Sequence, residues 1–368
     1  MSRLVEKGLY SSRVHSPTRG NRSVAQQHEI MNDRPVRNVL IIVAMEQETM
    51  PLVKRFDLKR CPDKTFLPGA PFVGWSGNVG DIVLRVVWCG RDPRFGGVNN
   101  VATTAAAVAT YASIAAFGTP ELLVSAGTAG GFNAAGAAVG DCFMSAKCIF
   151  HARRIPSDGG HALEEYGFGH FRSPPLGALA ARAGLKVGVI STSDSLDSSN
   201  IDLELMRSEG AAVKEMEAAS VAWVCQTLSV PFVALKAITD IVDGAHATRD
   251  EFESNLHMAS AALQQKVELV LQLIANTKLS EWAGNRGSMG DGKMSSGMQQ
   301  PNGGKGAEAC GSAAAATLPS KQPDDGRPAR STRSQALAFA TAFAALVAGV
   351  ALGVVAGRRL PTGHSSGA

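Results

Sequence analysis

Three short stretches of the sequence place acidic side chains beside apolar runs. They are Glu46 and Glu48 after residues 39–45, Glu215 and Glu217 on either side of Met216, and Asp240 and Asp243 after residues 231–239. A carboxyl group among apolar side chains can hold or release a proton near neutral pH, because burial disfavours its charged form. Several such groups together can also stabilise a developing positive charge. Each residue has a simpler interpretation as well, since a carboxylate at a helix start stabilises the helix dipole.

A fourth stretch of interest is Gly127-Thr128-Ala129-Gly130-Gly131, whose side chains are small enough for a ligand to lie against the backbone. We expect it to form a turn after a strand at 121–127. It lacks the lysine of a phosphate-binding P-loop and does not fit G-x-G-x-x-G, so alone it identifies no ligand. If the three acidic stretches converge on one cleft, however, a functional site is indicated, because buried carboxylates are costly to assemble.

Other kinds of catalytic site find little support in the sequence. The eight histidines show no H-E-x-x-H or other metal-binding spacing, and no G-x-S-x-G nucleophile motif occurs. The six cysteines never form a C-x-x-C pair, which indicates free thiols in a reducing compartment. We therefore expect neither a metal nor a cofactor.

The elements that must position these residues follow the sequence pattern of an α/β protein. Near-continuous apolar runs are predicted as strands, and they alternate with Ala-rich stretches of helical length at 99–117 and 217–228. A final helix is predicted over 249–275. The predicted strands are 39–45, 81–89, 121–127, 141–150, 185–192 and 231–239. This pattern indicates a three-layer α/β/α sandwich, in which ligands bind at the carboxyl ends of the strands.

Charge is unevenly distributed along the 368 residues. The net charge of +4 conceals a central region, residues 38–280, with twenty basic and twenty-four acidic residues. Each flank is strongly basic, with seven basic and three acidic residues in 1–37 and nine and five in 281–368. The basic pI is therefore a property of the flanks, and nothing indicates a nucleic-acid partner.

Five motifs in order, VLIIVAMEQE, SAGTAGGF, STSDSLD, KEMEAA and KAITDIVDG, resemble the 5′-methylthioadenosine/S-adenosylhomocysteine nucleosidases, especially the plant-type branch of this family, within the nucleoside phosphorylase superfamily. The resemblance extends from about residue 38 to residue 279. It implies a homodimeric α/β sandwich with a central mixed, partly barrel-like sheet. It also implies hydrolysis of the N-glycosidic bond of 5′-methylthioadenosine, a step of methionine salvage, with S-adenosylhomocysteine as a second candidate substrate.

The resemblance implies a role for each matched residue. Glu48 would activate water, Glu217 would hold the ribose hydroxyls, and Asp240 would protonate N7 of adenine. The residues expected to contact the substrate are Met45, Thr128, Glu215, Met216 and the backbone around Leu196.

The residue types agree with this chemistry on physical grounds. A purine leaves a riboside as a neutral base only if it is protonated, so Asp240 must carry a proton and needs a pKa above the usual ~3.9. Burial and the charges of Glu48 and Glu217 would raise that pKa. The same charges favour a sugar with cationic character at C1′.

Two other functions stay open. A phosphorylase of the same superfamily would need cationic residues for phosphate, and Arg91 and Arg94 are candidates, although Glu48 would repel the anion. Such enzymes usually carry an arginine three residues before the Ser/Thr of the glycine stretch, where this chain has Ser125. A non-catalytic purine-binding or storage protein is the second alternative, but it has no need of an acid at N7.

The sequence divides into five regions. A disordered or targeting leader, 1–37, precedes the catalytic domain, 38–280, and a flexible linker, 281–334, follows it. Residues 335–357 contain twenty-two consecutive uncharged residues, which as a helix would extend ~33 Å and could cross a bilayer core of ~30 Å. A short tail, 358–368, ends the chain. We expect a C-terminal transmembrane helix that anchors a cytosolic catalytic domain, and a plastid or mitochondrial location if the leader is a transit peptide.

Overall fold

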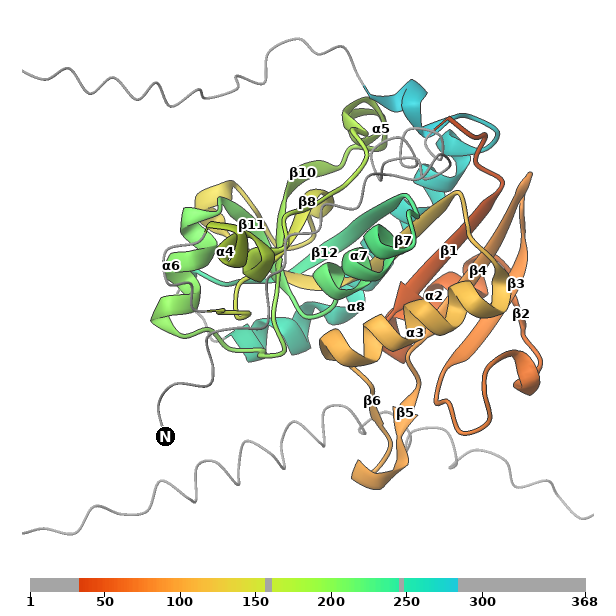
Figure 1. The fold of residues 1–368 in the computed structure, drawn as a ribbon, viewed down its shortest axis with the longest axis horizontal. Helices are drawn as coiled ribbons and strands as arrows, with labels where there is room; N and C mark the ends of the chain where they lie inside the picture. Colours follow the sequence, from red (N-terminus) through yellow and green to blue (C-terminus); the bar gives the residue numbers. More distant parts are fainter. Residues whose placement is uncertain (1–32, 156–160, 245–247, 284–368) are drawn as a thin grey trace, which may run out of the picture. The chain divides into compact units, whose positions relative to one another are not determined.

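The computed structural model of the chain describes residues 33–155, 161–244 and 248–283. These residues form an α/β unit built on a ten-stranded mixed sheet, with a separate two-stranded hairpin, β5–β6 (Figure 1). The strands are β1 (Asn38–Val43), β2 (Lys59–Arg60), β3 (Val73–Val79), β4 (Ile82–Trp88), β5 (Arg91–Asp92), β6 (Val98–Asn99), β7 (Leu122–Gly131), β8 (Cys142–Phe150), β9 (Phe171–Arg172), β10 (Lys186–Thr192), β11 (Ala211–Glu215) and β12 (Phe232–Ile241). The helices are α2 (Glu46–Arg55), α3 (Ala102–Phe117), α4 (His161–Phe168), α5 (Gly177–Ala183), α6 (Asn200–Ser208), α7 (Ala218–Thr227) and α8 (Thr248–Ile274). Short 3₁₀ turns are η1 (Asp63–Thr65), η2 (Pro93–Phe95), η3 (Asn133–Ala135) and η4 (Leu279–Trp282).

The strand order of the main sheet is β11-β10-β8-β12-β7-β1-β4-β3-β2, with β9 paired to β8. The first half of β7 pairs with β1, whereas its last two residues, Gly130 and Gly131, pair antiparallel with Lys214 and Val213 of β11. That second pairing joins the two ends of the row β11-β10-β8-β12-β7 and closes it into a barrel. The prediction of an α/β fold with a mixed, partly barrel-like sheet is confirmed.

The prediction of a turn at residues 127–131 is wrong, because these residues continue β7. The glycines instead permit close approach of neighbouring groups. A Cβ at position 130 would lie 2.7 Å from Oδ2 of Asp240, and one at position 131 would lie 2.6 Å from the Cβ of Ala137. A larger side chain at either position would push β7 away from β12 or from the loop that follows.

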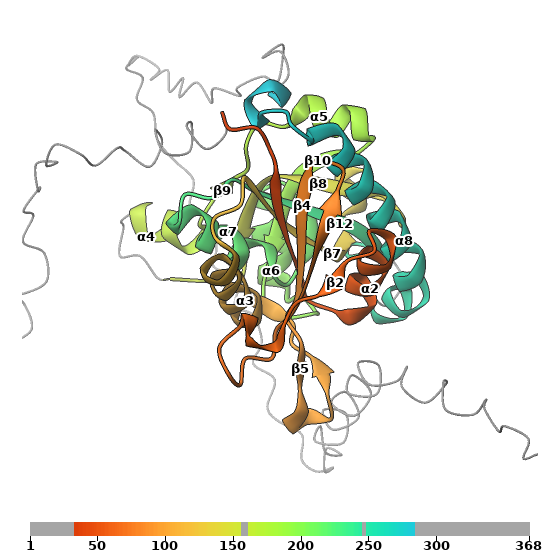
Figure 2. The ribbon, with the colours of Figure 1, turned by 90° about the vertical axis from the view of Figure 1, so that its right-hand side faces the viewer.

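Helices cover both faces of the sheet, and β1 shows how the sequence produces this arrangement. Its alternate residues Val39, Ile41 and Val43 pack into a core with α2, α5 and α8, while Leu40 and Ile42 pack into a second core with α3 and α7. A strand buried on both faces must be apolar throughout, as this one is. Figure 2 shows α2 and α8 on one side of the strands and α3 and α7 on the other.

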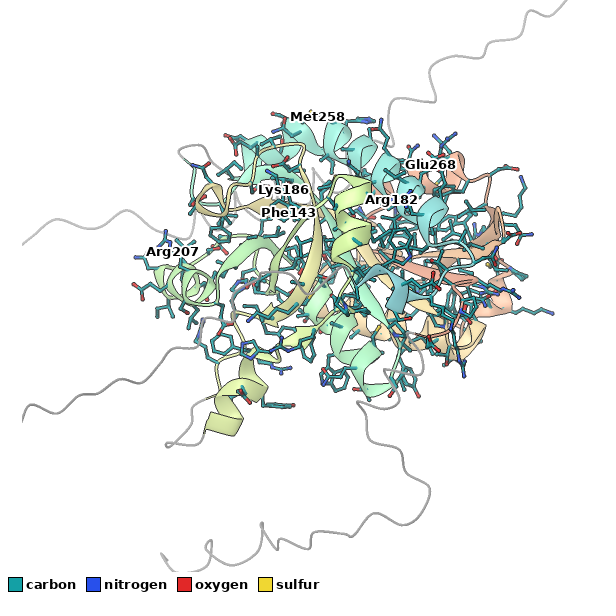
Figure 3. The ribbon with its side chains drawn as sticks, turned by 90° about the horizontal axis from the view of Figure 1, so that it is seen from above. Phe143, Arg182, Lys186, Arg207, Met258 and Glu268 are labelled. Atoms are coloured by element: carbon teal, nitrogen blue, oxygen red, sulfur yellow. The ribbon has the colours of Figure 1, made fainter. Side chains whose placement is uncertain are left out.

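The long helix α8 has the apolar stripe that the sequence predicts, with Ala259, Leu263, Val267, Val270 and Leu271 buried. Its outward face carries Met258 and Glu268, which Figure 3 shows from above. Glu268 forms an ion pair with Arg55 of α2, so the two helices of this layer are also joined at the surface.

Within the three described ranges, no helix combines the length and the hydropathy that a bilayer span requires. The predicted transmembrane segment, 335–357, lies outside those ranges, as do the leader up to residue 32 and the linker from residue 284 onward.

Candidate active site

The three predicted catalytic carboxylates follow, or lie near the end of, three different strands. Glu48 is in the first turn of α2 after β1, Glu217 immediately precedes α7 after β11, and Asp240 is near the end of β12. Glu48 and Asp240 are buried, and the side chain of Glu217 is 13% exposed. Residues 236–241 of β12 run alongside residues 127–131 of β7, so Asp240 lies beside the strand that carries Thr128.

Glu48 is held by Thr128 of β7, the strand that contains the closely packed glycines. Its Oε1 accepts hydrogen bonds of 2.6 Å from both the amide and the hydroxyl of Thr128, and its Oε2 accepts one of 3.3 Å from the amide of Met45. Burial raises the pKa of Glu48, and the bonds from Thr128 and the charge of Lys236 partly oppose this rise. A carboxylate whose pKa is raised in this way is suited to accept a proton from water.

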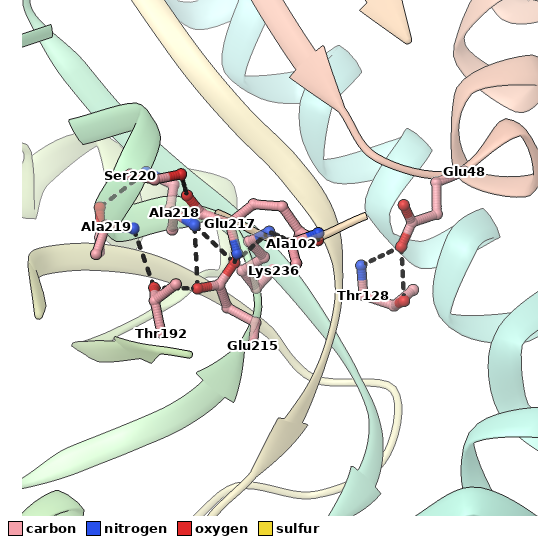
Figure 4. Close-up of polar contacts among 12 residues, drawn as sticks. Glu48, Ala102, Thr128, Thr192, Glu215, Glu217, Ala218, Ala219, Ser220 and Lys236 are labelled. Atoms are coloured by element: carbon pink, nitrogen blue, oxygen red, sulfur yellow. Dashed lines mark hydrogen bonds and ion pairs between the residues drawn. The ribbon is translucent and has the colours of Figure 1, made fainter. Parts of the chain in front are cut away.

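A buried lysine joins Glu48 to the second carboxylate. Lys236 of β12 forms an ion pair of 2.8 Å with Glu215, and its Nζ lies 3.7 Å from Oε2 of Glu217. A Cβ at Gly127 would lie 3.3 Å from both the Lys236 Nζ and the Glu48 Oε1, so these two groups flank the same glycine. The cluster therefore contains three carboxylates and one ammonium group (Figure 4).

Glu217 is the member of this cluster whose charge is least well compensated. Burial raises its pKa to about 7, the charges of Glu215 and Glu48 contribute to the rise, and Lys236 opposes it. Its Oε1 accepts a hydrogen bond of 3.0 Å from the amide of Ala102. A group that titrates near neutral pH can exchange a proton or stabilise a cation as the reaction requires.

Glu215 has a different environment from the one expected of a substrate contact. Its carboxylate is 1% exposed and accepts bonds from Lys236, from the hydroxyl of Thr192 and from the amides of Glu217 and Ala218. These protein donors use both oxygens and hold its pKa below the usual value despite burial. The structure therefore shows Glu215 capping α7 and fixing Lys236, rather than presenting its carboxylate to a ligand.

Asp240 has one oxygen without a hydrogen-bond partner. Oδ1 accepts a bond of 2.7 Å from the hydroxyl of Thr239, whereas Oδ2 is buried and unpaired. Burial raises the pKa of Asp240, and Thr239 and Lys214 partly oppose the rise. Since buried polar atoms are normally paired, a free Oδ2 on a carboxyl group that retains its proton is an available donor.

The loop that contains Leu196 is fixed by a second buried lysine. Lys214 of β11 donates hydrogen bonds of 2.9 and 2.6 Å to the carbonyl oxygens of Ser195 and Leu196. The same lysine contributes to the pKa of Asp240, so the loop and the carboxyl group share one neighbour. The structure thus brings the predicted backbone contact close to the predicted acid.

The two methionines and the remaining acidic residues are also accounted for. Met45 and Met216 are half-buried. Met45 directly precedes α2, and Met216 lies between the end of β11 and Glu217, the residue before α7. Asp243 accepts hydrogen bonds from the amides of Asn133 and Ala134, and Glu46 pairs with Arg91. Asp243 and Glu46 therefore have the structural roles that acidic residues at element ends commonly have.

Sequence reasoning missed Lys214 and Lys236. Each is the one basic residue of a mostly apolar strand, in AAVKE and FVALKAITDI. Because lysine is rarely buried without a partner, this placement was a usable signal for a buried charge cluster. In the part of the chain that the structure describes, no three His, Cys, Asp or Glu side chains gather in a way that could hold a metal ion.

The fold and the site together define a class of protein: a barrel-like α/β fold with buried carboxylates near the ends of its strands. The comparison with known families agrees with this class. The family model described as "Phosphorylase superfamily" matches residues 38–274. The 5′-methylthioadenosine nucleosidase of Arabidopsis thaliana is 39% identical over 258 residues, which cover 70% of this chain and 94% of the relative. A 5′-methylthioadenosine/S-adenosylhomocysteine nucleosidase of the same organism is 38% identical over 67% of this chain and 96% of the relative.

Solved structures give the same result. The apo structure of Arabidopsis thaliana 5′-methylthioadenosine nucleosidase matches this chain with a TM-score of 0.65. The match covers 67% of this chain and 100% of the Arabidopsis chain. A nucleosidase from Colwellia psychrerythraea in complex with adenine is 25% identical, with a TM-score of 0.51 over 66% of this chain and 97% of its own. The chain belongs to the 5′-methylthioadenosine/S-adenosylhomocysteine nucleosidase family of the phosphorylase superfamily.

Proposed function

We propose that the protein hydrolyses the N-glycosidic bond of 5′-methylthioadenosine, and that of S-adenosylhomocysteine, to release adenine. The observation that carries this proposal is the unpaired Oδ2 of Asp240, a buried carboxyl oxygen beside the strand that holds Glu48 through Thr128. Membership of the family supports the choice of substrates, since the relatives carry these nucleosides in their names.

The proposed reaction gives each of these groups a task. Asp240, whose pKa burial raises, acts as the acid that gives a proton to N7, so that adenine leaves as a neutral base. Glu48 accepts a proton from the attacking water, with Thr128 holding the carboxylate in place. Glu217 accepts hydrogen bonds from the ribose hydroxyls, and together with Glu48 it stabilises the cationic sugar. Met45, Met216 and the backbone at Leu196 complete the walls of this site.

Phosphorolysis is the second candidate reaction, and the two arginines that it could use are already paired. Arg91 bonds to Glu46 and to the carbonyl of Gly97, and Arg94 bonds to Asp92. Ser125, at the usual arginine position, is buried in β7. The test is adenine release from each nucleoside in phosphate-free buffer, with phosphate added in a parallel reaction. Hydrolysis predicts equal rates in both, whereas a strict requirement for phosphate would identify a phosphorylase.

We further propose that the protein is a homodimer that associates through α3 and α7. These neighbouring helices expose large apolar side chains, among them Val108, Tyr111 and Trp223. Large apolar side chains exposed on neighbouring helices favour a protein–protein contact. A second copy of the chain is the occupant that the family resemblance implies.

We also propose that residues 335–357 anchor the protein in a membrane with the catalytic domain in the cytosol. Support comes from the length of this uncharged stretch and from the two arginines, Arg358 and Arg359, that follow it. Imaging of chains tagged at either end, together with extraction of membranes at high pH, tests the proposal. A protein that is fully soluble, or imported into a plastid or mitochondrion through its leader, would contradict it.

A further inference from the structure

The chain from the end of β6 to the first turn of α3, residues 99–103, hydrogen-bonds to the first turn of α2 on one side and to Glu217 on the other. We call it the 99–103 segment. It begins with Asn99, a buried polar residue, and contains Ala102, whose φ of +76° lies in the left-handed region. Residues with a Cβ disfavour this region, and such conformations persist only where the surroundings hold them.

Asn99 holds the first turn of α2, which carries Glu48. Its Oδ1 accepts hydrogen bonds of 3.0 Å from the amide of Glu46 and from the indole of Trp88, and its Nδ2 donates one of 3.2 Å to Gln47. The amide of Glu46 is one of the donors that a helix start leaves unpaired. The N-cap residue, Met45, has no side-chain oxygen for any amide of this turn, and Asn99 supplies an acceptor for the amide of Glu46 from a distant part of the sequence.

The other end of the segment holds Glu217 in a related way. The N-cap residue of α3 is Val101, which also lacks a side-chain acceptor. The amide of Ala102 instead donates to Glu217, and the amide of Thr103 donates a bond of 2.8 Å to Asp194 in the loop before α6. The left-handed conformation of Ala102 orients these two amides toward their carboxylates.

We propose that the 99–103 segment is a positioning element for hydrolysis, in which Asn99 fixes Glu48 and Ala102 fixes Glu217. The inference rests on the proposed function. Because only two residues separate Asn99 from Ala102, a displacement of the segment moves the water-activating group and the ribose-binding group together. Neither Asn99 nor Ala102 needs to touch the substrate for this effect.

The first test compares turnover in three variants. Asn99→Ala removes all three hydrogen bonds, Asn99→Asp keeps the two that the oxygen accepts, and Asn78→Ala changes an exposed asparagine on β3 as a control. Because a misplacement of about 1 Å can cost ~10²-fold in rate, kcat of Asn99→Ala should fall by that order with little change in KM. Asn99→Asp should retain most of the turnover, and Asn78→Ala should match the wild type. A folded Asn99→Ala protein with wild-type kcat would overturn the proposal.

The second test needs no turnover, so it decides the proposal even if the protein releases no adenine. Carboxyl ¹³C NMR follows the titration of Glu217 in Ala102→Val, where a β-branched side chain cannot keep φ at +76°, and in Ala102→Gly, which can. The bond from Ala102 lowers the pKa of Glu217, so its loss in Ala102→Val should raise that pKa above its wild-type value near 7. Ala102→Gly should titrate as the wild type does.

The same titration follows Glu48 in Asn99→Ala. The bonds from Met45 and Thr128 lower the pKa of Glu48, so their disturbance should raise it. Unchanged titration of Glu217 in Ala102→Val and of Glu48 in Asn99→Ala would show that the segment does not position the carboxylates. Failure of the proposed function would appear separately, as a wild-type protein that binds or releases no adenine.

Discussion

At the scale of single residues, the site depends on buried carboxyl groups whose pKa values their partners shift in different directions. Asp240 and Glu48 have raised pKa values, Glu217 titrates near 7, and Glu215 stays ionised because Lys236 and several donors pair with it. The sequence pointed to all four groups from their type and place near strand ends, and the family resemblance assigned their roles. It could not show which oxygens were already paired, because those partners come from other strands.

Replacing Asp240 with Asn tests the acid. The amide keeps the shape of the carboxyl group but has no acidic proton for N7, so kcat should fall ~10²- to 10⁴-fold. Stability at pH 7 should be equal or higher, because a buried carboxyl group with a raised pKa costs free energy when it ionises. Adenine release and thermal unfolding measure both effects, and near wild-type turnover would remove Asp240 from the mechanism.

Glu217 should determine the acid limb of the pH profile. If its ionised form stabilises the transition state, kcat/KM should rise with pH through about 7, where Glu217 loses its proton. Glu217→Gln should lower kcat/KM and lack this limb. The unfolded chain releases the same proton near the usual value of 4.5, so the free energy of unfolding should decrease as the pH rises from that value to about 7, and it should decrease less in the variant than in the wild type. An acid limb that persists in Glu217→Gln belongs to another group.

At the scale of elements, β7, β11 and β12 provide most of the site. Gly127 and Gly130 of β7 let Glu48, Lys236 and Asp240 approach the backbone, and β12 carries both Lys236 and Asp240. The six strands predicted from apolar runs correspond to β1, β4, β7, β8, β10 and β12, whereas β3, which has seven residues, was not predicted. The short β11 was not predicted, because five residues with a lysine and a glutamate show no clear period, and its pairing with β7 depends on residues eighty positions away.

Lys236 is expected to stabilise the junction of β11 and β12 strongly. Lys236→Met leaves the buried Glu215 without its counter-ion, and breaking a buried pair in this way costs about 3–5 kcal/mol. The pKa of Glu217 should rise as well, since Lys236 lowers it. Denaturant unfolding measures the loss in the free energy of unfolding. Lys186→Met is the matched control, because its pair with Asp141 is partly exposed and should contribute at most ~1 kcal/mol. Similar losses in both variants would refute the special role of the buried pair.

At the scale of the whole molecule, all the described residues belong to one compact unit. The motifs of the sequence predicted the family, which the relatives confirm over about two-thirds of the chain. Composition alone located the flanks and the apolar stretch at 335–357, but composition gives no information on which residues contact one another in the fold. The membrane association of that stretch therefore stays a prediction.

The dimer proposal predicts that a charge on α7 separates the subunits. Trp223 is 44% exposed, and Trp223→Glu should shift the protein from dimer to monomer in sedimentation velocity, because a buried unpaired carboxylate is costly in an interface. Met258→Glu places the same charge at a residue 49% exposed on α8, in the other helix layer, and should leave the sedimentation coefficient unchanged. A monomeric wild type would contradict the proposal directly.

The closure of the barrel through Gly130 and Gly131 also has a consequence for folding. The strand pairing of these glycines with β11 joins parts of the chain that are far apart in sequence, and such contacts tend to form late. Asp240 lies against Gly130, so its local environment is complete only when the ring of strands has closed. During refolding, recovery of catalysis should therefore lag behind the formation of secondary structure and coincide with the final closing step.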